Sequence, residues 1–356
     1  VRREGHTLTI VASTLSGDEI PENLMREMRS SIVFLGAVVS RLGKARLSFP
    51  GGCELGPRPI DLHLAALRKM GLHIREDHGC LECSVPGRLR GCPISLSFPS
   101  VGATENVMLA AVCAEGSTIL SNAAREPEIC DLADFLNACG GRVSGAGESE
   151  IVIQGVESLG GCEHQVIPDR IVAATYLAAA AATGSELTLR HVDCSHLQLV
   201  LPVFEEAGCS LRSQGKSLWI QAPERLRPVG NVRTMPYPGF PTDAQAPVMA
   251  MACLADGTSL FVENIFESRY KHAGELMRLG ARIKVEGRVA VVEGVPALSG
   301  APVQAPDLRG GAALLVAGLG AQGTTLLSGL HHLDRGYEAV EKALASVGAD
   351  IRRETA

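Results

Sequence analysis

Residues 279–283 read Leu-Gly-Ala-Arg-Ile, in which a glycine ends a helical pattern and an aliphatic residue follows three positions later. Glycine just past a helix favours a left-handed cap, and the residues after it begin a strand. This arrangement occurs five times along the chain, counting the stretch quoted. The five glycines lie 69, 68, 72 and 68 residues apart and are Gly71, Gly140, Gly208, Gly280 and Gly348.

A second series of glycines runs in phase with the first. Each of these glycines follows an apolar helical pattern and leads into a strand pattern such as Ser117–Leu120. They are spaced 73, 68, 73 and 66 residues apart and are Gly43, Gly116, Gly184, Gly257 and Gly323. Two independent markers with one period predict a repeated unit of about 70 residues that contains strand and helix twice over. The predicted fold class is therefore α/β.

The start of the chain falls inside this repeat. Polar residues follow Val1, a turn is predicted at Gly5 and a strand at Thr7–Val11, which is the order that follows each capping glycine elsewhere. We therefore expect a further capping glycine ahead of Val1 and an incomplete first repeat. Six repeats would divide into two domains of three, with predicted boundaries at residues 1–166 and 167–356.

Composition limits the classes of function. Of the 356 residues 46% are hydrophobic and 20% charged, as in a globular protein. A net charge of -6 argues against nucleic acid as the main partner, and no apolar run reaches the roughly 18–20 residues of a membrane span. The eleven cysteines are irregularly spaced and favour reduced thiols. We expect a cytoplasmic protein without nucleic-acid or membrane partners.

Buried helices are predicted wherever the pattern is apolar on nearly all faces. Charged or hydroxyl residues stand before each of them, so several helix N-termini would lie at one end of each domain. Backbone N–H groups and the helix dipole make such an end suited to anions. Two domains facing each other there would form a cleft for anionic substrates. The predicted helices are Ser31–Leu42, Val107–Cys113, Ile171–Ala182, Ala246–Leu254 and Ala312–Leu319.

The segment from Pro50 to His63 is rich in glycine and proline and too irregular for a helix or a strand before Asp61. A loop of this length is usually functional. It places Cys53 five residues from Arg58, and a nearby cation favours the thiolate. The alternative is a surface loop with an incidental cysteine.

This loop closely resembles the active-site loop of the UDP-N-acetylglucosamine enolpyruvyl transferases, in which Pro-Gly-Gly precedes the cysteine and Gly-x-Arg-Pro-x-Asp-Leu-His follows it. Further motifs of that family occur in order from about Leu24 to the end of the chain. The resemblance implies a two-domain enolpyruvyl transferase fold with inside-out α/β barrel-like domains of three repeats each. The further motifs are Ser100–Thr104, Asn122–Glu128, Pro168–Arg170, Phe240–Asp243, Asp307–Arg309 and Asp334–Glu338.

The implied reaction is transfer of the enolpyruvyl group of phosphoenolpyruvate to the 3′-hydroxyl of UDP-N-acetylglucosamine. Phosphate leaves after addition and elimination, and the product enters peptidoglycan synthesis. The resemblance implies small-molecule substrates, no metal, no organic cofactor and a monomer.

The resemblance also implies catalytic roles for three residues. Cys53 would protonate the methylene carbon of phosphoenolpyruvate and could form a covalent adduct with it. Asp243 would be the general base near the sugar hydroxyl, although its position before an apolar helix also fits an N-cap. Arg335 would hold phosphoenolpyruvate, where a planar guanidinium suits an oxyanion.

The remaining predicted site residues would bind substrate. Arg58 would serve both phosphoenolpyruvate and uracil, Arg309 would assist with phosphoenolpyruvate, and Ile265 would contact the acetamido sugar through its backbone. Arg269 matches a family arginine whose role the sequence does not specify. The residues assigned to the nucleotide sugar are Arg29, Arg58, Pro59, Ile60, Asp61, Leu62, His63, Ser100, Val101 and Gly102.

Two departures from the family pattern stand out. The family's Lys-Asn pair belongs to the first repeat and has no counterpart in these 356 residues, so we expect the chain as given to be impaired alone. Phe98-Pro99 stands where the family commonly has a lysine near the diphosphate. Alternatives are the shikimate-pathway enolpyruvyl transferase and an inactive homologue that binds the UDP-sugar. Cys80 and Cys83 lie in a strand pattern that points them to opposite faces, which argues against metal binding.

Overall fold

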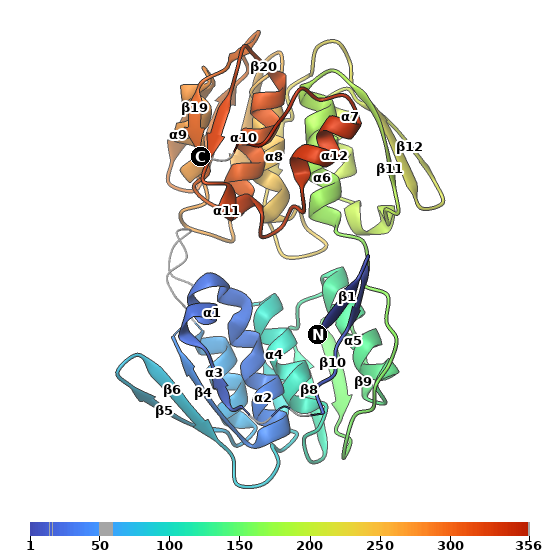
Figure 1. The fold of residues 1–356 in the computed structure, drawn as a ribbon, viewed down its shortest axis with the longest axis vertical. Coiled ribbons are helices and arrows are strands. Elements are labelled where there is room, and N and C mark those ends of the chain that lie inside the picture. Colours follow the sequence, from blue (N-terminus) through green and yellow to red (C-terminus); the bar gives the residue numbers. More distant parts are fainter. Residues whose placement is uncertain (14, 16, 50–59, 355–356) are drawn as a thin grey trace. The chain divides into compact units, whose positions relative to one another are not determined.

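The computed structural model describes residues 1–13, 15, 17–49 and 60–354, and Figure 1 draws the chain. Two compact units are present: the described residues of the first end at Gln165, and the second begins at Val166. Neither unit's described residues include a helix long and apolar enough to cross a membrane.

The first unit contains two four-stranded sheets of the same design. In each sheet the first pair of strands is parallel and the remaining pairs are antiparallel. One sheet has the order β3 (Glu19–Ile20), β4 (Lys44–Ser48), β6 (Cys80–Ser84), β5 (His73–Asp77). The other has the order β7 (Pro93–Ser95), β8 (Ser117–Ser121), β10 (Glu150–Gln154), β9 (Arg142–Ser144). A separate hairpin pairs β1 (Arg2–Glu4) with β2 (Thr7–Thr9).

The helices of the first unit pack together against these sheets. Helix α4 contacts α2, α3 and α5, and Figure 1 shows α2, α3 and α4 between the two sheets. Ala103, Val107 and Met108 of α4 are fully buried because small and apolar residues occupy its packed faces. The helical segments are α1 (Glu22–Glu27), the 3-10 turn η1 (Arg29–Val33), α2 (Phe34–Leu42), α3 (Asp61–Lys69), α4 (Val101–Ala111) and α5 (Pro127–Ala138).

The second unit repeats this design around three packed helices. Helices α6 (Arg170–Ala182), α8 (Thr242–Ala252) and α10 (Leu308–Gly320) contact one another and form its core. The sheets are β11 (Glu186–Arg190), β13 (Ser217–Gln221), β12 (Ser210–Gln214); β14 (Asn231–Arg233), β15 (Thr258–Val262), β17 (Val289–Glu293), β16 (Arg282–Glu286); and the pairs β18 (Leu298–Ser299) with β20 (Ala321–Gln322) and β19 (Pro302–Gln304) with β21 (Leu326–Ser328). The other helical segments are η2 (Cys194–Leu197), α7 (Leu201–Glu206), α9 (Lys271–Arg278), α11 (Leu330–Leu333) and α12 (Val340–Ser346).

Both glycine series adopt the left-handed backbone that the sequence predicts. The five glycines of the first series have φ between 93 and 100°, and those of the second have φ between 62 and 140°. A side chain at these positions would be strained, so the period of the glycines reflects the period of the backbone.

Four of the five predicted helices differ from the structure at their N-terminal ends. Helix α4 begins at Val101 and not at Val107, and α10 begins at Leu308 and not at Ala312. The predicted helix 31–42 is a 3-10 turn to Val33 followed by α2 from Phe34. The predicted helix 246–254 begins earlier, at Thr242, so Asp243 lies within its first turn. The sequence pattern placed the starts of the helices at 31 and 246 by their apolar residues. In the structure, polar residues with tertiary partners determine these two starts.

Candidate active site

Asp243 is the centre of a charged cluster at the start of α8. Its two carboxylate oxygens accept hydrogen bonds from two different arginines, Arg269 at 2.8 Å and Arg309 at 3.3 Å. The N-cap of α8 is Pro241 and no side chain caps the helix, so the N-cap interpretation of Asp243 is wrong. The side chain of Asp243 is 40% exposed, so this fixed carboxylate remains open to a ligand.

Arg269 is the buried member of this cluster, with a side chain 2% exposed. The same terminal nitrogen that contacts Asp243 also donates to the Thr242 carbonyl at 3.2 Å, and the guanidinium lies 5.7 Å from the Phe266 ring centre. A buried cation is stable when it is paired and hydrogen-bonded. The structure supplies the partner, Asp243, that the sequence did not specify for Arg269.

Arg309 reaches Asp243 from the first turn of α10. Asp307 caps this helix by accepting the N–H groups of Arg309 and Gly310 at 3.0 Å each. The Arg309 side chain also donates to the Tyr337 hydroxyl at 3.1 Å. Burial opposes its charge, but the Asp243 carboxylate and Tyr337 together hold the pKa of Arg309 above its usual value. Arg309 is thus a fixed cation at the edge of the cluster.

His272 lies behind the cluster and is fully buried. Neither of its ring nitrogens has a partner among the described residues. Burial lowers its pKa to about 4, with Arg269 acting in the same direction and Asp307 against it. His272 is therefore neutral near pH 7 and adds no further positive charge beside Asp243.

Glu263 is a site residue that sequence reasoning missed. It is 1% exposed and sits just after β15. One oxygen accepts the backbone N–H groups of Ile265 at 2.8 Å and Phe266 at 3.0 Å, and the other accepts from Thr242 at 2.9 Å and Gln245 at 3.2 Å. Glu263 thereby fixes the Ile265 loop to the start of α8, beside Asp243. A lone acid after an apolar strand is too weak a signal to reveal this role.

Arg335 lies two residues beyond α11 and is exposed. Its guanidinium donates to Nδ1 of His332 at 3.1 Å. The neighbouring Asp334 pairs with Arg353 at 3.0 and 2.6 Å, and this pairing lowers the pKa of the Asp334 carboxyl. The structure thus places Arg335 beside His332, and Asp243 beside Arg269 and Arg309.

In the first unit, the predicted diphosphate residues form the N-terminus of α4. Ser100 is the N-cap, and its hydroxyl accepts the Ala103 N–H at 3.3 Å. The N–H groups of Val101 and Gly102 belong to the first turn, where no helical carbonyl precedes them. A side chain on Gly102 would meet His63 Cε1 at 3.2 Å, so His63 lies directly against this helix start.

The position of His63 is determined by Asn106, which is fully buried on α4. The Asn106 amide nitrogen lies 3.0 Å from Nδ1 of His63 and donates to the Ile32 carbonyl at 3.0 Å. Its oxygen accepts the Gly36 N–H at 2.6 Å, which fixes the orientation of the amide. Because an amide nitrogen only donates, Nδ1 of His63 is the acceptor and the proton resides on Nε2.

Asn106 also explains the division between η1 and α2. Ile32 and Gly36 are four residues apart, and an uninterrupted α-helix would join the Ile32 carbonyl to the Gly36 N–H. Here the Asn106 amide takes both groups instead. A Cβ atom at position 36 would lie closer to the Asn106 backbone oxygen than two atoms in contact can approach. Only glycine therefore fits at this position.

The other predicted binding residues are described in part. Ile60 is buried before α3, Asp61 and Leu62 form its first turn, and the Leu64 N–H donates to the Ile60 carbonyl at 3.1 Å. Cys53, Arg58 and Pro59, and the side chain of Arg29, lie outside the described residues.

Glu105, on α4, is a titratable group that the sequence did not single out. Burial raises its pKa to about 7, and the negative charges of Glu128 and Glu126 act in the same direction. Glu105 therefore changes its protonation state near neutral pH, within one turn of Gly102.

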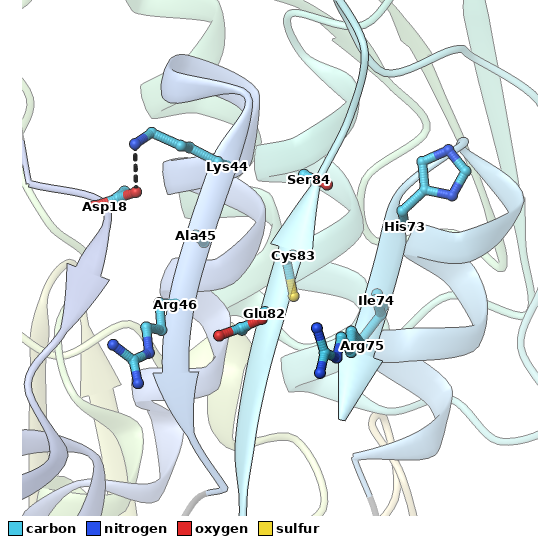
Figure 2. Close-up of a pocket in the computed structure, with 10 residues that line it drawn as sticks. All are labelled: Asp18, Lys44, Ala45, Arg46, His73, Ile74, Arg75, Glu82, Cys83 and Ser84. Atoms are coloured by element: carbon cyan, nitrogen blue, oxygen red, sulfur yellow. Dashed lines mark ion pairs between the residues drawn. The ribbon is translucent and has the colours of Figure 1, made fainter. Parts of the chain in front are cut away.

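A surface hollow outside these clusters lies on the sheet of β4, β5 and β6 (Figure 2). It is lined by charged residues such as Lys44, Arg46 and Glu82 and by none of the predicted site residues. Cys83 faces it from a buried position in β6. Within the described ranges, no group of three or more His, Cys, Asp or Glu residues could hold a metal ion.

Comparison with known proteins connects these clusters to a family. The family model described as EPSP synthase (3-phosphoshikimate 1-carboxyvinyltransferase) matches residues 2–344. UDP-N-acetylglucosamine 1-carboxyvinyltransferase 1 of Symbiobacterium thermophilum is 54% identical over 349 residues, which are 98% of this chain and 79% of that protein. The chain belongs to the UDP-N-acetylglucosamine 1-carboxyvinyltransferase family. It is a transferase enzyme of the carboxyvinyl class.

Further members and solved structures agree with this placement. The UDP-N-acetylglucosamine 1-carboxyvinyltransferase of Geobacter metallireducens is 46% identical over 353 residues, or 99% of this chain and 84% of that protein. The enolpyruvyl transferase NikO of Streptomyces tendae superposes with a TM-score of 0.85 at 28% identity, covering 97% of this chain and 82% of its own. EPSP synthase of Acinetobacter baumannii shares the fold at a TM-score of 0.66 and 20% identity. The enolpyruvyl transferase fold that the sequence predicts is confirmed.

Proposed function

We propose that this chain transfers the enolpyruvyl group of phosphoenolpyruvate to the 3′-hydroxyl of UDP-N-acetylglucosamine and releases phosphate. The observation that carries the proposal is the fixed Asp243 carboxylate in a chain 54% identical to a protein named for this reaction. The reaction needs one group to take the proton of the sugar hydroxyl and another to protonate the methylene carbon of phosphoenolpyruvate. Asp243 is the proposed group for the first proton transfer and Cys53 for the second.

Asp243 is the proposed base for the sugar hydroxyl. A base must be held within hydrogen-bond reach of the proton that it takes. Arg269 and Arg309 hold the two oxygens of Asp243 and so fix the carboxylate in one orientation for this proton transfer.

The proposed sugar contacts surround Asp243. The Ile265 N–H is taken by Glu263, so the Ile265 carbonyl is the backbone group offered to the acetamido sugar. Glu263 fixes this loop to the residue before Asp243 through Thr242. Glu263 therefore holds the Ile265 loop and the helix start that carries Asp243 in a fixed relative position.

The donor contacts rest on the family resemblance. Cys53 is the proposed acid for the methylene carbon. Arg58, Arg309 and Arg335 are the proposed cations for the phosphate and carboxylate, because guanidinium groups match such oxyanions. Of these, Arg309 is already fixed beside Asp243, which links the donor cations to the base.

The proposed diphosphate site is the N-terminus of α4. The N–H groups of Val101 and Gly102 point out of the first turn, and the helix dipole favours anions there. His63 adds a donor, because Asn106 leaves the proton on Nε2 and that edge of the ring lies beside Gly102. Residues Arg58 to Leu62 are the proposed uracil contacts, and Arg29 is a proposed contact of the sugar and diphosphate.

The proposal is tested by measuring phosphate release from phosphoenolpyruvate and UDP-N-acetylglucosamine. The chain is assayed alone and with the N-terminal segment of a relative placed ahead of Val1, which adds the family's Lys-Asn pair. We expect release by the extended form that Cys53→Ala abolishes. Binding of UDP-N-acetylglucosamine without any release from either form would sink the enzyme proposal.

We further propose that the protein is a cytoplasmic monomer. Its substrates are small molecules, and a complete base cluster is present within one copy of the second unit. Light scattering after size exclusion tests the oligomeric state, and a stable dimer at assay concentration would contradict a monomer.

A further inference from the structure

The segment that ends the first unit lies along one side of α5. Residues 155–165 form neither helix nor strand and run to the boundary at Gln165; we name them the linker segment. Three contacts attach it to α5: the Gly160 N–H donates to the Cys139 carbonyl at 2.7 Å, His164 pairs with Asp131 at 2.9 Å, and the His164 ring packs on Phe135 at 5.6 Å between centroids.

The three positions used on α5 and its cap are four residues apart, at 131, 135 and 139. Residues with this spacing lie on one face of a helix. The linker segment therefore follows the α5 axis over two turns. Its contacts with α5 are polar or aromatic, and Leu159 packs against the apolar core of the first unit.

At the end of this face, the Sγ atoms of Cys139 and Cys162 are 3.3 Å apart. Cys139 is buried at the end of α5, and Cys162 is exposed on the linker segment. Among the cysteines that the structure describes, no other pair of sulfurs is recorded in contact. Neither residue belongs to the proposed active site.

We propose that Cys139 and Cys162 are a redox modification site, at which a low-molecular-weight disulfide oxidises the two thiols to an intramolecular disulfide. A disulfide bond is about 2.05 Å long, so the sulfurs must approach by roughly 1.2 Å. The linker segment can supply this movement because backbone hydrogen bonds of a helix or strand do not hold it. The bond would close a loop whose ends are 23 residues apart.

The chemistry proceeds by two thiol–disulfide exchanges. The exposed Cys162 thiolate attacks glutathione disulfide, forms a mixed disulfide and releases one glutathione thiolate. Cys139 then loses its proton to solvent, attacks the Cys162 sulfur and releases the second glutathione thiolate. The protein loses two electrons and two protons, and one glutathione disulfide is reduced to two glutathiones.

The second exchange limits the rate. Burial, and then the neighbouring Cys162 thiol, raise the pKa of Cys139 to about 11. The reactive thiolate of Cys139 is therefore scarce at neutral pH, and its fraction rises about tenfold per pH unit. We expect ring closure to accelerate in the same proportion between pH 7 and 9, with the mixed disulfide at Cys162 accumulating at the lower pH.

The disulfide would anchor the linker segment covalently to α5. In the reduced protein, residues 160–165 are held to α5 by one backbone hydrogen bond, one side-chain contact between His164 and Asp131 and one ring contact, while Gly155 and Val156 donate backbone hydrogen bonds to Gly116 and Val112. Oxidation should therefore slow amide hydrogen exchange in residues 156–165 at least tenfold, while α8 in the second unit keeps its exchange rate.

The test is peptide mapping of the intact chain after incubation with glutathione disulfide at pH 8.5, where the thiolate fraction of Cys139 is about thirtyfold larger than at pH 7. Free thiols are blocked with N-ethylmaleimide before trypsin digestion. Cys139 lies in the peptide Glu126–Arg142, which also holds Cys130, and Cys162 lies in Val143–Arg170. We expect these two peptides to be cross-linked, to separate on reduction, and to be joined at Cys139 in fragment spectra.

Cys130→Ser is the matched control, because Cys130 lies on the same helix and in the same peptide. The cross-link should persist in Cys130→Ser and vanish in Cys139→Ser, in which Cys162 should carry glutathione instead. Recovery of both Cys139 and Cys162 as maleimide adducts in the oxidised wild-type chain would overturn the proposal, as would a cross-link from Cys162 to Cys130.

Discussion

Replacing Asn106 with alanine should loosen the packing of α4 on α2. Its amide is fully buried and satisfies three groups: the Gly36 N–H at 2.6 Å, the Ile32 carbonyl at 3.0 Å and Nδ1 of His63 at 3.0 Å. Leaving a buried polar group without a partner costs about 1–3 kcal/mol. In the variant, Ile32 and Gly36 could rejoin as an ordinary helical bond, which would offset part of this loss. We therefore expect the local free energy of unfolding of α2 and α4 to fall by about 3 kcal/mol.

Hydrogen exchange measured by mass spectrometry reports this loss locally. A change of about 3 kcal/mol corresponds to exchange on the order of a hundredfold faster in peptides from α2 and α4. Fluorescence of Trp219, the one tryptophan of the chain, reports the second unit and should be unchanged in the native state. Local exchange is preferable to a single melting curve because two compact units need not unfold as one transition.

Asn137→Ala is the matched control for this measurement. Asn137 also bonds a backbone pair, the N–H and carbonyl of Val143 at 2.8 and 2.9 Å, but its side chain is exposed. Water replaces such bonds, so the expected loss is about 1 kcal/mol. Equal losses in the two variants would refute the reasoning, because burial would then make no difference to the cost.

Three further predictions concern the site. Arg269→Met should lower kcat/KM for the transfer reaction about a hundredfold by releasing one oxygen of the base, whereas Arg278→Met, on the exposed face of α9, should leave it unchanged. Glu105 binds its proton more tightly when folded, so stability falls as pH rises from about 4.5 to about 7; Glu105→Gln should be more stable than wild type by about 3 kcal/mol at pH 8 and equal near pH 4 in urea unfolding. Gly102→Ala should weaken UDP-N-acetylglucosamine binding about tenfold by calorimetry, because its methyl group would press on His63.

The repeated architecture was predictable from the sequence because glycine carries a strong backbone signal. A left-handed residue after a helix is nearly always glycine, so the two glycine series record where each helix stops. Their positive φ values in the structure follow directly. Helix starts were less predictable. Asn106 converts the first turn before α2 into a 3-10 segment from 70 or more residues away along the chain, and no local pattern encodes that distance.

The candidate site was predictable where family motifs name a residue and unpredictable where a role depends on tertiary contact. Asp243 and Arg309 were identified from motifs, but their pairing joins elements 66 residues apart. Glu263 was not identified from the sequence, because its role depends on the hydrogen bonds that it accepts from four groups and not on its neighbours in the sequence. Asn106 was not identified for the same reason, because the sequence of a helix does not indicate which of its polar side chains is buried and hydrogen-bonded.

The most direct test of the proposed reaction is to identify the product formed from phosphoenolpyruvate with each of two acceptors. The extended chain is incubated with UDP-N-acetylglucosamine or with 3-phosphoshikimate, and the products are analysed by mass spectrometry beside an Asp243→Asn variant. We predict that UDP-N-acetylglucosamine gains the mass of one enolpyruvyl group, that 3-phosphoshikimate is unchanged, and that the variant forms the product at least a hundredfold more slowly. Modification of 3-phosphoshikimate alone, or full activity of Asp243→Asn, would contradict it.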